Sequence, residues 1–175
     1  MSPTEPKRRI EIKLRDISQL FNSMDPSPFH DRDLDDDAEQ FIVSSVEELP
    51  LEAPAMLSIR LENAPGERDA PTVQTAVHNY FAYRSEMNRK AFRRLMQQGR
   101  TSLLIGLLFL SVCMGAGRFF FGGDSTWDAL LRESLMVVGW VAMWRPIEIY
   151  LYDWWPLRRK GRIYQKLSQM TVEIS

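Results

Sequence analysis

The chain has 175 residues, a net charge of −1 and 45% hydrophobic residues, so its average composition resembles that of a soluble protein. A single cysteine excludes an intrachain disulfide, and one cysteine with two histidines offers too few ligands for a typical zinc site. Charge is uneven: residues 1–72 carry 8 basic and 16 acidic side chains, and residues 73–175 carry 14 and 7. The basic part favours an anionic membrane surface over nucleic acid, because its charges gather at the ends of apolar segments.

Three segments alternate apolar and polar side chains, which predicts half-buried strands within residues 10–15, 57–62 and 168–175. Helical spacing of apolar residues predicts an amphipathic helix over 36–49, capped by Asp36 with Glu39 in a capping box. The last strand has no core of its own, so we expect it to return to the first two. The prediction is a split α/β module, 8–62 plus 168–175, with about three strands and one covering helix.

The helical pattern that begins at residue 72 continues to residue 121 without a proline. Its first part, 71–100, predicts a long cytoplasmic juxtamembrane helix, with Gly99 as a possible soft point. The second part, 101–121, is uncharged from Thr101 through Gly117 and has the length of a transmembrane helix. The chain is therefore expected to be a membrane protein of the α+β class.

A second apolar region predicts another crossing over 130–151, after a short periplasmic loop at 122–129. Two interpretations stay open: a full crossing with Arg145 and Glu148 paired inside, or a shorter crossing with that pair at the interface. Basic residues precede the first crossing and fill the return helix at 152–167, while the loop is acidic. By the positive-inside rule both termini lie in the cytoplasm, and the two crossings form a hairpin inserted into the module.

The apolar segments contain three groups of candidate functional residues. Arg145 and Glu148 share a helix face, where they could lock the hairpin, line a polar path, or form a self-satisfied interfacial pair. Small residues predict close helix packing, against the same hairpin or a neighbouring subunit; they are Ser102, Gly106, Cys113, Gly117 and Gly139. Anionic headgroups would be bound by Arg93, Arg94, Arg100, Arg158, Arg159 and Lys160.

The acidic segment 25–39 offers a second candidate surface. Asp31, Asp33 and Asp35 have the spacing that opens a calcium loop, but the pattern fails at its sixth and twelfth positions, so metal is a weak candidate. A capped turn is the favoured interpretation, and an acidic partner surface is the alternative. That surface would comprise Phe29, His30, Asp31, Arg32 and Asp33. Since no catalytic or cofactor-binding motif occurs, no cofactor is expected.

The stretches at 20–42 and 144–167, with the order of the segments, resemble an uncharacterised family of small two-pass bacterial inner-membrane proteins. The resemblance covers most of the chain and implies a bacterial inner membrane. It implies no activity, so no catalytic residue is carried over.

The pattern as a whole predicts a non-catalytic membrane-anchored scaffold or accessory subunit, whose cytoplasmic module engages a protein partner or a second copy of the chain. One alternative is a small oligomeric channel or transporter that uses Arg145 and Glu148. A second is a membrane-bound hydrolase in which His30, beside Asp31, acts as general base.

Overall fold

The structure is a computed structural model that describes residues 8–28, 32–50, 53, 55–62, 69–123 and 125–175. It divides into two compact units. The first contains the chain up to Arg89 together with Arg159–Ser175, and the second contains Lys90–Arg158. The second unit is thus an insertion in the sequence of the first.

The first unit is built on a three-stranded sheet in the order β1-β2-β3, with β1 at Arg8–Leu14, β2 at Ala55–Leu61 and β3 at Thr171–Ile174. Both pairs are parallel, which the strand pattern alone did not specify. The return of the last strand to the sheet is confirmed, because Leu57 of the central strand pairs in register with Ile10 on one side and Val172 on the other. Parallel neighbours need a crossover connection, and the second unit lies within the one that joins β2 to β3.

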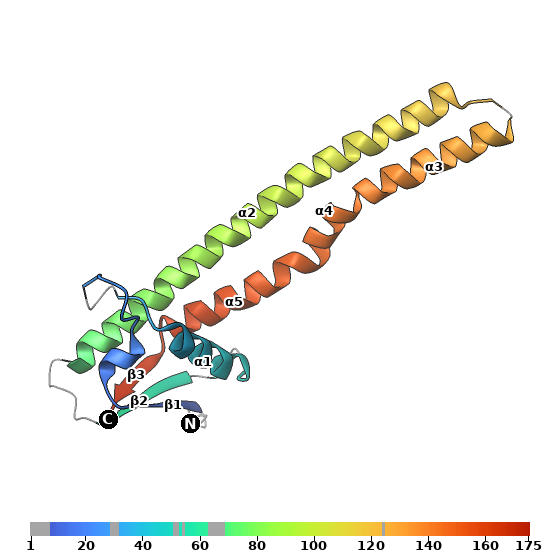
Figure 1. The fold of residues 1–175 in the computed structure, drawn as a ribbon. Helices are drawn as coiled ribbons and strands as arrows, with labels where there is room; N and C mark the ends of the chain where they lie inside the picture. The colour runs from blue at the N-terminus through green and yellow to red at the C-terminus, as the bar shows by residue number, and fades with distance from the viewer. Residues whose placement is uncertain (1–7, 29–31, 51–52, 54, 63–68, 124) are drawn as a thin grey trace, which may run out of the picture. The chain divides into compact units, whose positions relative to one another are not determined.

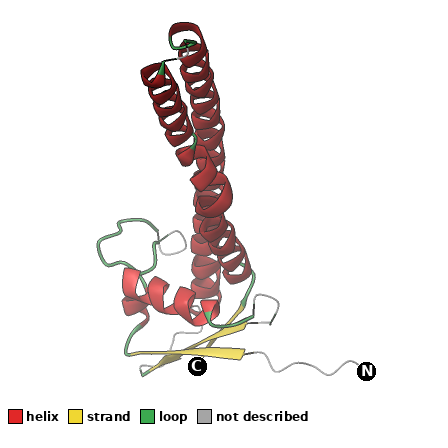
Figure 2. Ribbon diagram, turned by 90° about the vertical axis from the view of Figure 1, so that its right-hand side faces the viewer, coloured by secondary structure: helices red, strands yellow, loops and turns green. Residues whose placement is uncertain are grey.

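Three helical segments pack against this sheet, where the sequence predicted one (Figures 1 and 2). They are α1 at Asp36–Glu47, the first turns of α2 (Asp69–Phe120) and the last turns of α5 (Trp154–Leu167). Side chains that are fully buried come from all of these elements. The core includes Leu57, Ile59, Ile42, Val46, Val77, Phe81, Ile163 and Leu167.

The other face of the sheet is polar. Ser58 on the central strand is fully buried there, and its hydroxyl oxygen accepts a hydrogen bond of 2.7 Å from Arg9 Nη2. On the same face Arg60 lies 3.4 Å from Glu11 in an ion pair. One apolar and one charged face agree with the strict alternation of the strands.

The start of α1 corrects the predicted cap. Asp35, not Asp36, is the N-cap residue, and its carboxylate accepts a 3.0 Å hydrogen bond from the backbone of Asp37. The predicted capping box is also wrong, since Glu39 is buried among side chains from α2 and α5. Two aspartates in the first turn still complement the helix dipole.

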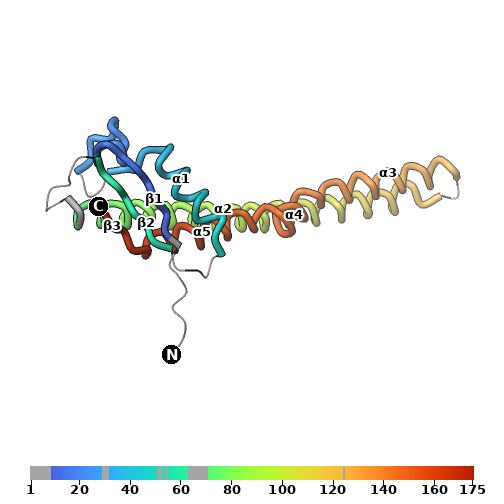
Figure 3. Tube along the Cα trace, turned by 90° about the horizontal axis from the view of Figure 1, so that it is seen from below, coloured from blue at the N-terminus to red at the C-terminus, as the bar shows by residue number. Residues whose placement is uncertain are grey.

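The second unit consists of two antiparallel helical runs, which lie side by side in Figures 1 and 3. The outgoing run is the remainder of α2, which continues without interruption to Phe120, through Gly99. The returning run is broken into α3 (Thr126–Ala142), α4 (Trp144–Glu148), a π-helix at Ile149–Asp153, and the first turn of α5.

Among the described helices, one is long and apolar enough to cross a membrane, namely α2 from Pro71 to Phe120. In its most apolar window only 17% of the residues are buried, so it does not pack like the core helix of a soluble protein. By comparison, α3 has 17 residues and would extend about 26 Å, short of the roughly 30 Å of a hydrocarbon core.

Candidate functional site

A buried polar cluster joins three helices of the first unit. Glu39 on α1 accepts hydrogen bonds from the hydroxyls of Tyr80 on α2, at 2.6 Å, and Tyr164 on α5, at 3.3 Å. Arg84 on α2 completes the cluster, with Nη2 2.7 Å and Nε 2.8 Å from Oε1 of the same carboxylate. The Glu39 side chain is 10% exposed and that of Arg84 41%, so the carboxylate is inside and its counter-charge reaches the surface.

Aromatic rings surround the guanidinium of this cluster. The Arg84 Cζ atom lies 5.9 Å from the ring centre of Tyr80 and 5.7 Å from that of Tyr164, within the range of cation–π attraction. Phe81 stacks on Tyr164 at 6.4 Å and continues the cluster into the apolar core. Carboxylate, guanidinium and both hydroxyls all have partners, so the arrangement suits a structural clamp that holds α1, α2 and α5 together.

The clamp predicts a loss of stability in strong alkali. Burial, more than any other effect, raises the pKa of Tyr164 above its ordinary value of 10.0. Below pH 10 the tyrosine is protonated in both the folded and unfolded states; above it, the unfolded chain releases the proton first. The free energy of unfolding should therefore fall as the pH rises above about 10. Urea unfolding from pH 8 to 11 tests this, and Tyr164→Phe should flatten the slope; an equal slope in both proteins would contradict it.

A hollow of about 340 Å³ opens beside the clamp in the first unit. Its walls come from the loop before α1 and from α2, and it is lined by Asp25, Ser27, Asp33, Asn79, Tyr80 and Tyr83. The Asp25 carboxylate accepts hydrogen bonds from the backbone N–H groups of Asp33, at 2.7 Å, and Ser27, at 2.9 Å. These bonds, that from Asp33 first, lower the pKa of Asp25. Asp25 therefore shapes the loop, while Asp33 and Tyr83 present exposed side chains at the rim.

Part of the predicted partner surface lies outside the described residues, namely Phe29, His30 and Asp31. Of the rest, Asp33 lines the hollow and Arg32 precedes it. Asp35 of the weak metal candidates caps α1. Within the described part of the chain, no group of three histidine, cysteine or acidic residues could hold a metal ion.

Glycines bring the two runs of the second unit into close contact. A side chain on Gly106 would meet the backbone carbonyl of Ala142 and the sulfur of Met143, both at 3.0 Å. A Cβ on Gly139 would lie 3.3 Å from the Cβ of Cys113. Gly117 faces the stem of Arg132, and Ser102 bonds the carbonyl of Gly99 on its own helix at 3.1 Å.

The break in the returning run explains one of these contacts. Pro146 has no N–H, so the carbonyl of Ala142 four residues earlier cannot receive the usual helical hydrogen bond. That carbonyl is the atom that lies against Gly106. The small residue on α2 and the proline on the returning run are therefore two parts of one packing solution.

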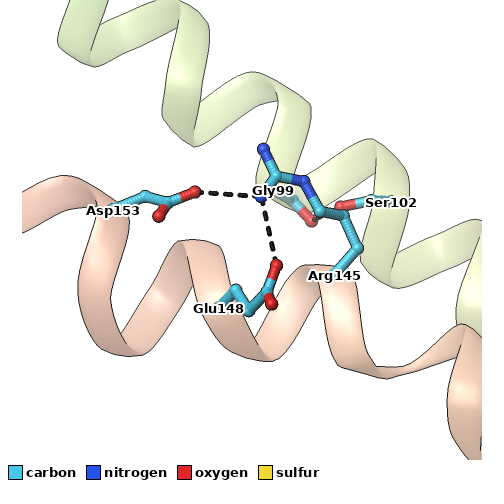
Figure 4. A network of polar contacts seen from close by, with 5 residues as sticks. All are labelled: Gly99, Ser102, Arg145, Glu148 and Asp153. Carbon is cyan, nitrogen blue, oxygen red and sulfur yellow. Dashed lines mark hydrogen bonds and ion pairs between the residues drawn. The ribbon is translucent and has the colours of Figure 1, made fainter.

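Arg145 forms two ion pairs, one more than the sequence suggested (Figure 4). Its Nη1 atom lies 3.2 Å from Glu148 Oε2 and 3.2 Å from Asp153 Oδ2. A regular α-helix would place a residue eight positions later about 80° around the helix from Arg145. The π-turn at Ile149–Asp153 takes up about one extra residue, which returns Asp153 to the face of Arg145. All three side chains are partly exposed, at 52%, 45% and 36%.

Most of the predicted headgroup residues present exposed side chains, including Arg93, Arg94 and Arg100 on α2. In the second unit, Arg158 stacks over Trp154 at 5.6 Å. In the first unit, Arg159 donates to the carbonyl of Glu47 at 3.2 Å, so it helps to hold α5 on α1. Lys160 is exposed.

Comparisons with protein-family models, with curated proteins and with solved structures gave no match for this chain.

Proposed function

We propose that this protein is a non-catalytic scaffold or accessory subunit, held in a bacterial inner membrane by a two-helix hairpin. In this proposal the α/β module lies on the cytoplasmic side and presents its surface to a protein partner. The bacterial setting rests on the resemblance of residues 20–42 and 144–167 to small two-pass inner-membrane proteins.

The observation that carries the proposal is the pairing of β2 with β3. The second unit separates these strands in the sequence, yet they are hydrogen-bonded neighbours in one sheet. A single crossing by α2 would leave them on opposite sides of the bilayer. If α2 crosses, the chain must cross back before residue 159, and α3 with α4 is the apolar segment available.

The polar groups of the returning run agree with this arrangement. Ser134–Trp144 carries no charge, and it is followed directly by the Arg145 triad, which we define as Arg145, Glu148 and Asp153. Trp144, Trp154 and Trp155 flank the triad, as is typical of the membrane–water interface. A short crossing would place Arg145 at the cytoplasmic boundary, where its two carboxylate partners reduce the cost of the charge.

The partner surface is proposed at the hollow beside the clamp. Asp33 and Tyr83 at its rim offer a carboxylate and an aromatic ring, a combination that suits a basic or polar segment of another protein. A helical clamp behind the hollow keeps this surface preformed.

Three measurements on the full chain test the proposal. A reporter that is active only in the periplasm should be active when inserted after Gly123 and silent when fused after Ser175. Pull-down in mild detergent should recover a reproducible partner that Asp33→Lys releases, while Glu62→Lys, the same charge change at another exposed acid, retains it. A periplasmic Ser175 fusion would refute the topology. If the protein conducts ions in liposomes and Glu148→Gln abolishes this flux, the protein is a channel and the scaffold proposal is wrong.

A further inference from the structure

The second unit contains a hollow of about 300 Å³ between α2 and α3, close to the loop that joins them. It is wholly formed by the antiparallel runs of this unit. Its lining combines two arginines with sulfur-containing side chains and a glycine: Cys113, Met114, Gly117, Arg118, Arg132 and Met136.

The two arginines converge on this hollow because Gly117 leaves room for one of them. The stem of Arg132 passes over Gly117, where an added Cβ would lie 3.3 Å from the arginine Cγ. Arg118 follows Gly117 directly on α2. Neither guanidinium forms an ion pair within the described part of the second unit. Asp128, one turn before Arg132, has its carboxylate against Gly123.

The position of the hollow along the helices matches the depth of a lipid phosphate. Arg118 is the first charge after the uncharged stretch from Thr101 through Gly117. Beside it, Phe119, Phe120 and Trp127 are 84%, 71% and 73% exposed. Exposed aromatic rings next to the end of an apolar stretch are characteristic of the headgroup boundary.

We propose that this hollow binds one anionic phospholipid. Its phosphate lies between the guanidiniums of Arg118 and Arg132, whose planar donors match phosphate oxygens. Its acyl chain follows Met114 and Met136, because flexible thioether side chains adapt to an irregular alkyl chain. Among the described residues these two cations have no ion-pair partner, which favours an anionic lipid over a zwitterionic one that brings a positive charge of its own. The inference rests on the proposed membrane insertion.

Native mass spectrometry of the full chain, released from a neutral detergent, measures this directly. Phosphatidylglycerol should bind at one molecule per chain, about tenfold more tightly than phosphatidylcholine with the same acyl chains. The double variant Arg118→Gln/Arg132→Gln should remove the preference. The matched double variant Lys13→Gln/Arg15→Gln, which deletes the same charge from the first unit, should retain it. Met136→Trp, which fills the hollow without changing charge, should also weaken binding.

Flotation with phosphatidylcholine vesicles separates this inference from the proposed function. If the chain floats but shows no preference for phosphatidylglycerol, or keeps the preference in the Arg118/Arg132 variant, the lipid site is refuted and the membrane anchor stands. If the chain does not float, the anchor fails and the lipid site fails with it. If millimolar inorganic phosphate displaces the bound lipid, the two arginines form a site for a free anion. That result would overturn the lipid proposal.

Discussion

Replacing Glu39 with alanine should lower the free energy of unfolding of the first unit by about 2–3 kcal/mol. The substitution leaves Arg84 without its carboxylate and two tyrosine hydroxyls without an acceptor. Removing one partner of a fully buried pair costs more, but Arg84 is 41% exposed and water takes up part of its charge. The urea midpoint of the full chain in neutral detergent, read by pulse proteolysis within residues 8–89, measures the loss.

Gln40→Ala is the matched control, because residue 40 is the exposed neighbour on the same helix. Its effect should stay within about 0.5 kcal/mol. Glu39→Gln should fall between the two, since an amide oxygen still accepts from Tyr80 but lacks the charge that faces Arg84. Equal midpoints for Glu39→Ala and Gln40→Ala would show that the clamp adds nothing to stability.

Replacing Gly106 with leucine should force the two runs of the second unit apart. The new side chain would occupy the place of the Ala142 carbonyl, which is backbone and cannot rotate away. A proximity assay is available, because Cys113 is the one cysteine of the chain and faces Gly139. In a Gly139→Cys background the two sulfurs should form a disulfide on mild oxidation, since the expected Cβ separation of 3.3 Å lies just below the usual range for a disulfide. The nearest atom to the new Cβ, Leu110 Cδ1 at 2.7 Å, is the end of a flexible side chain that can turn aside.

Adding Gly106→Leu to that background should slow disulfide formation about tenfold, the equivalent of about 1.4 kcal/mol of overpacking. Gly115→Leu provides the control on the same helix, because a Cβ added at that position has no neighbouring atom within 4 Å. If Gly115→Leu slows disulfide formation as much as Gly106→Leu does, leucine has a general effect on the helix. That result would contradict close packing at Gly106.

The sequence predicts the strands and α2 well for local reasons. Strict alternation places Ile10, Leu57 and Val172 on one face of their strands, and the long proline-free stretch allows one continuous helix. The prediction of a returning third strand needed one more argument, that an isolated amphipathic strand requires a sheet. Parallel order has no comparable local signal, because both orders bury the same residues.

Predictions were weaker where the role of a residue depends on distant segments. Glu39 has the spacing of a capping box, and its actual partners lie on helices far along the sequence. A signal was available in the sequence: the helical positions Val73, Val77 and Phe81 form an apolar face before the uncharged stretch of α2 begins at Thr101, which indicates packing against a module. Asp153 was missed because a regular helix does not bring it to Arg145, and no local sequence rule predicts the π-turn that does.

The parallel crossover from β2 to β3 also sets the order in which the chain can fold. Ribosomes make a chain from its N-terminus, so β2 has one neighbour, β1, until residues 171–174 have been synthesised. Its second edge closes only after the entire insertion has been made and has brought β3 back to it. The sheet can therefore be completed only after the two helical runs of the second unit have formed and returned the chain to β2. In a chain whose second run does not return, the edge of β2 stays unpaired and accessible to chaperones and proteases.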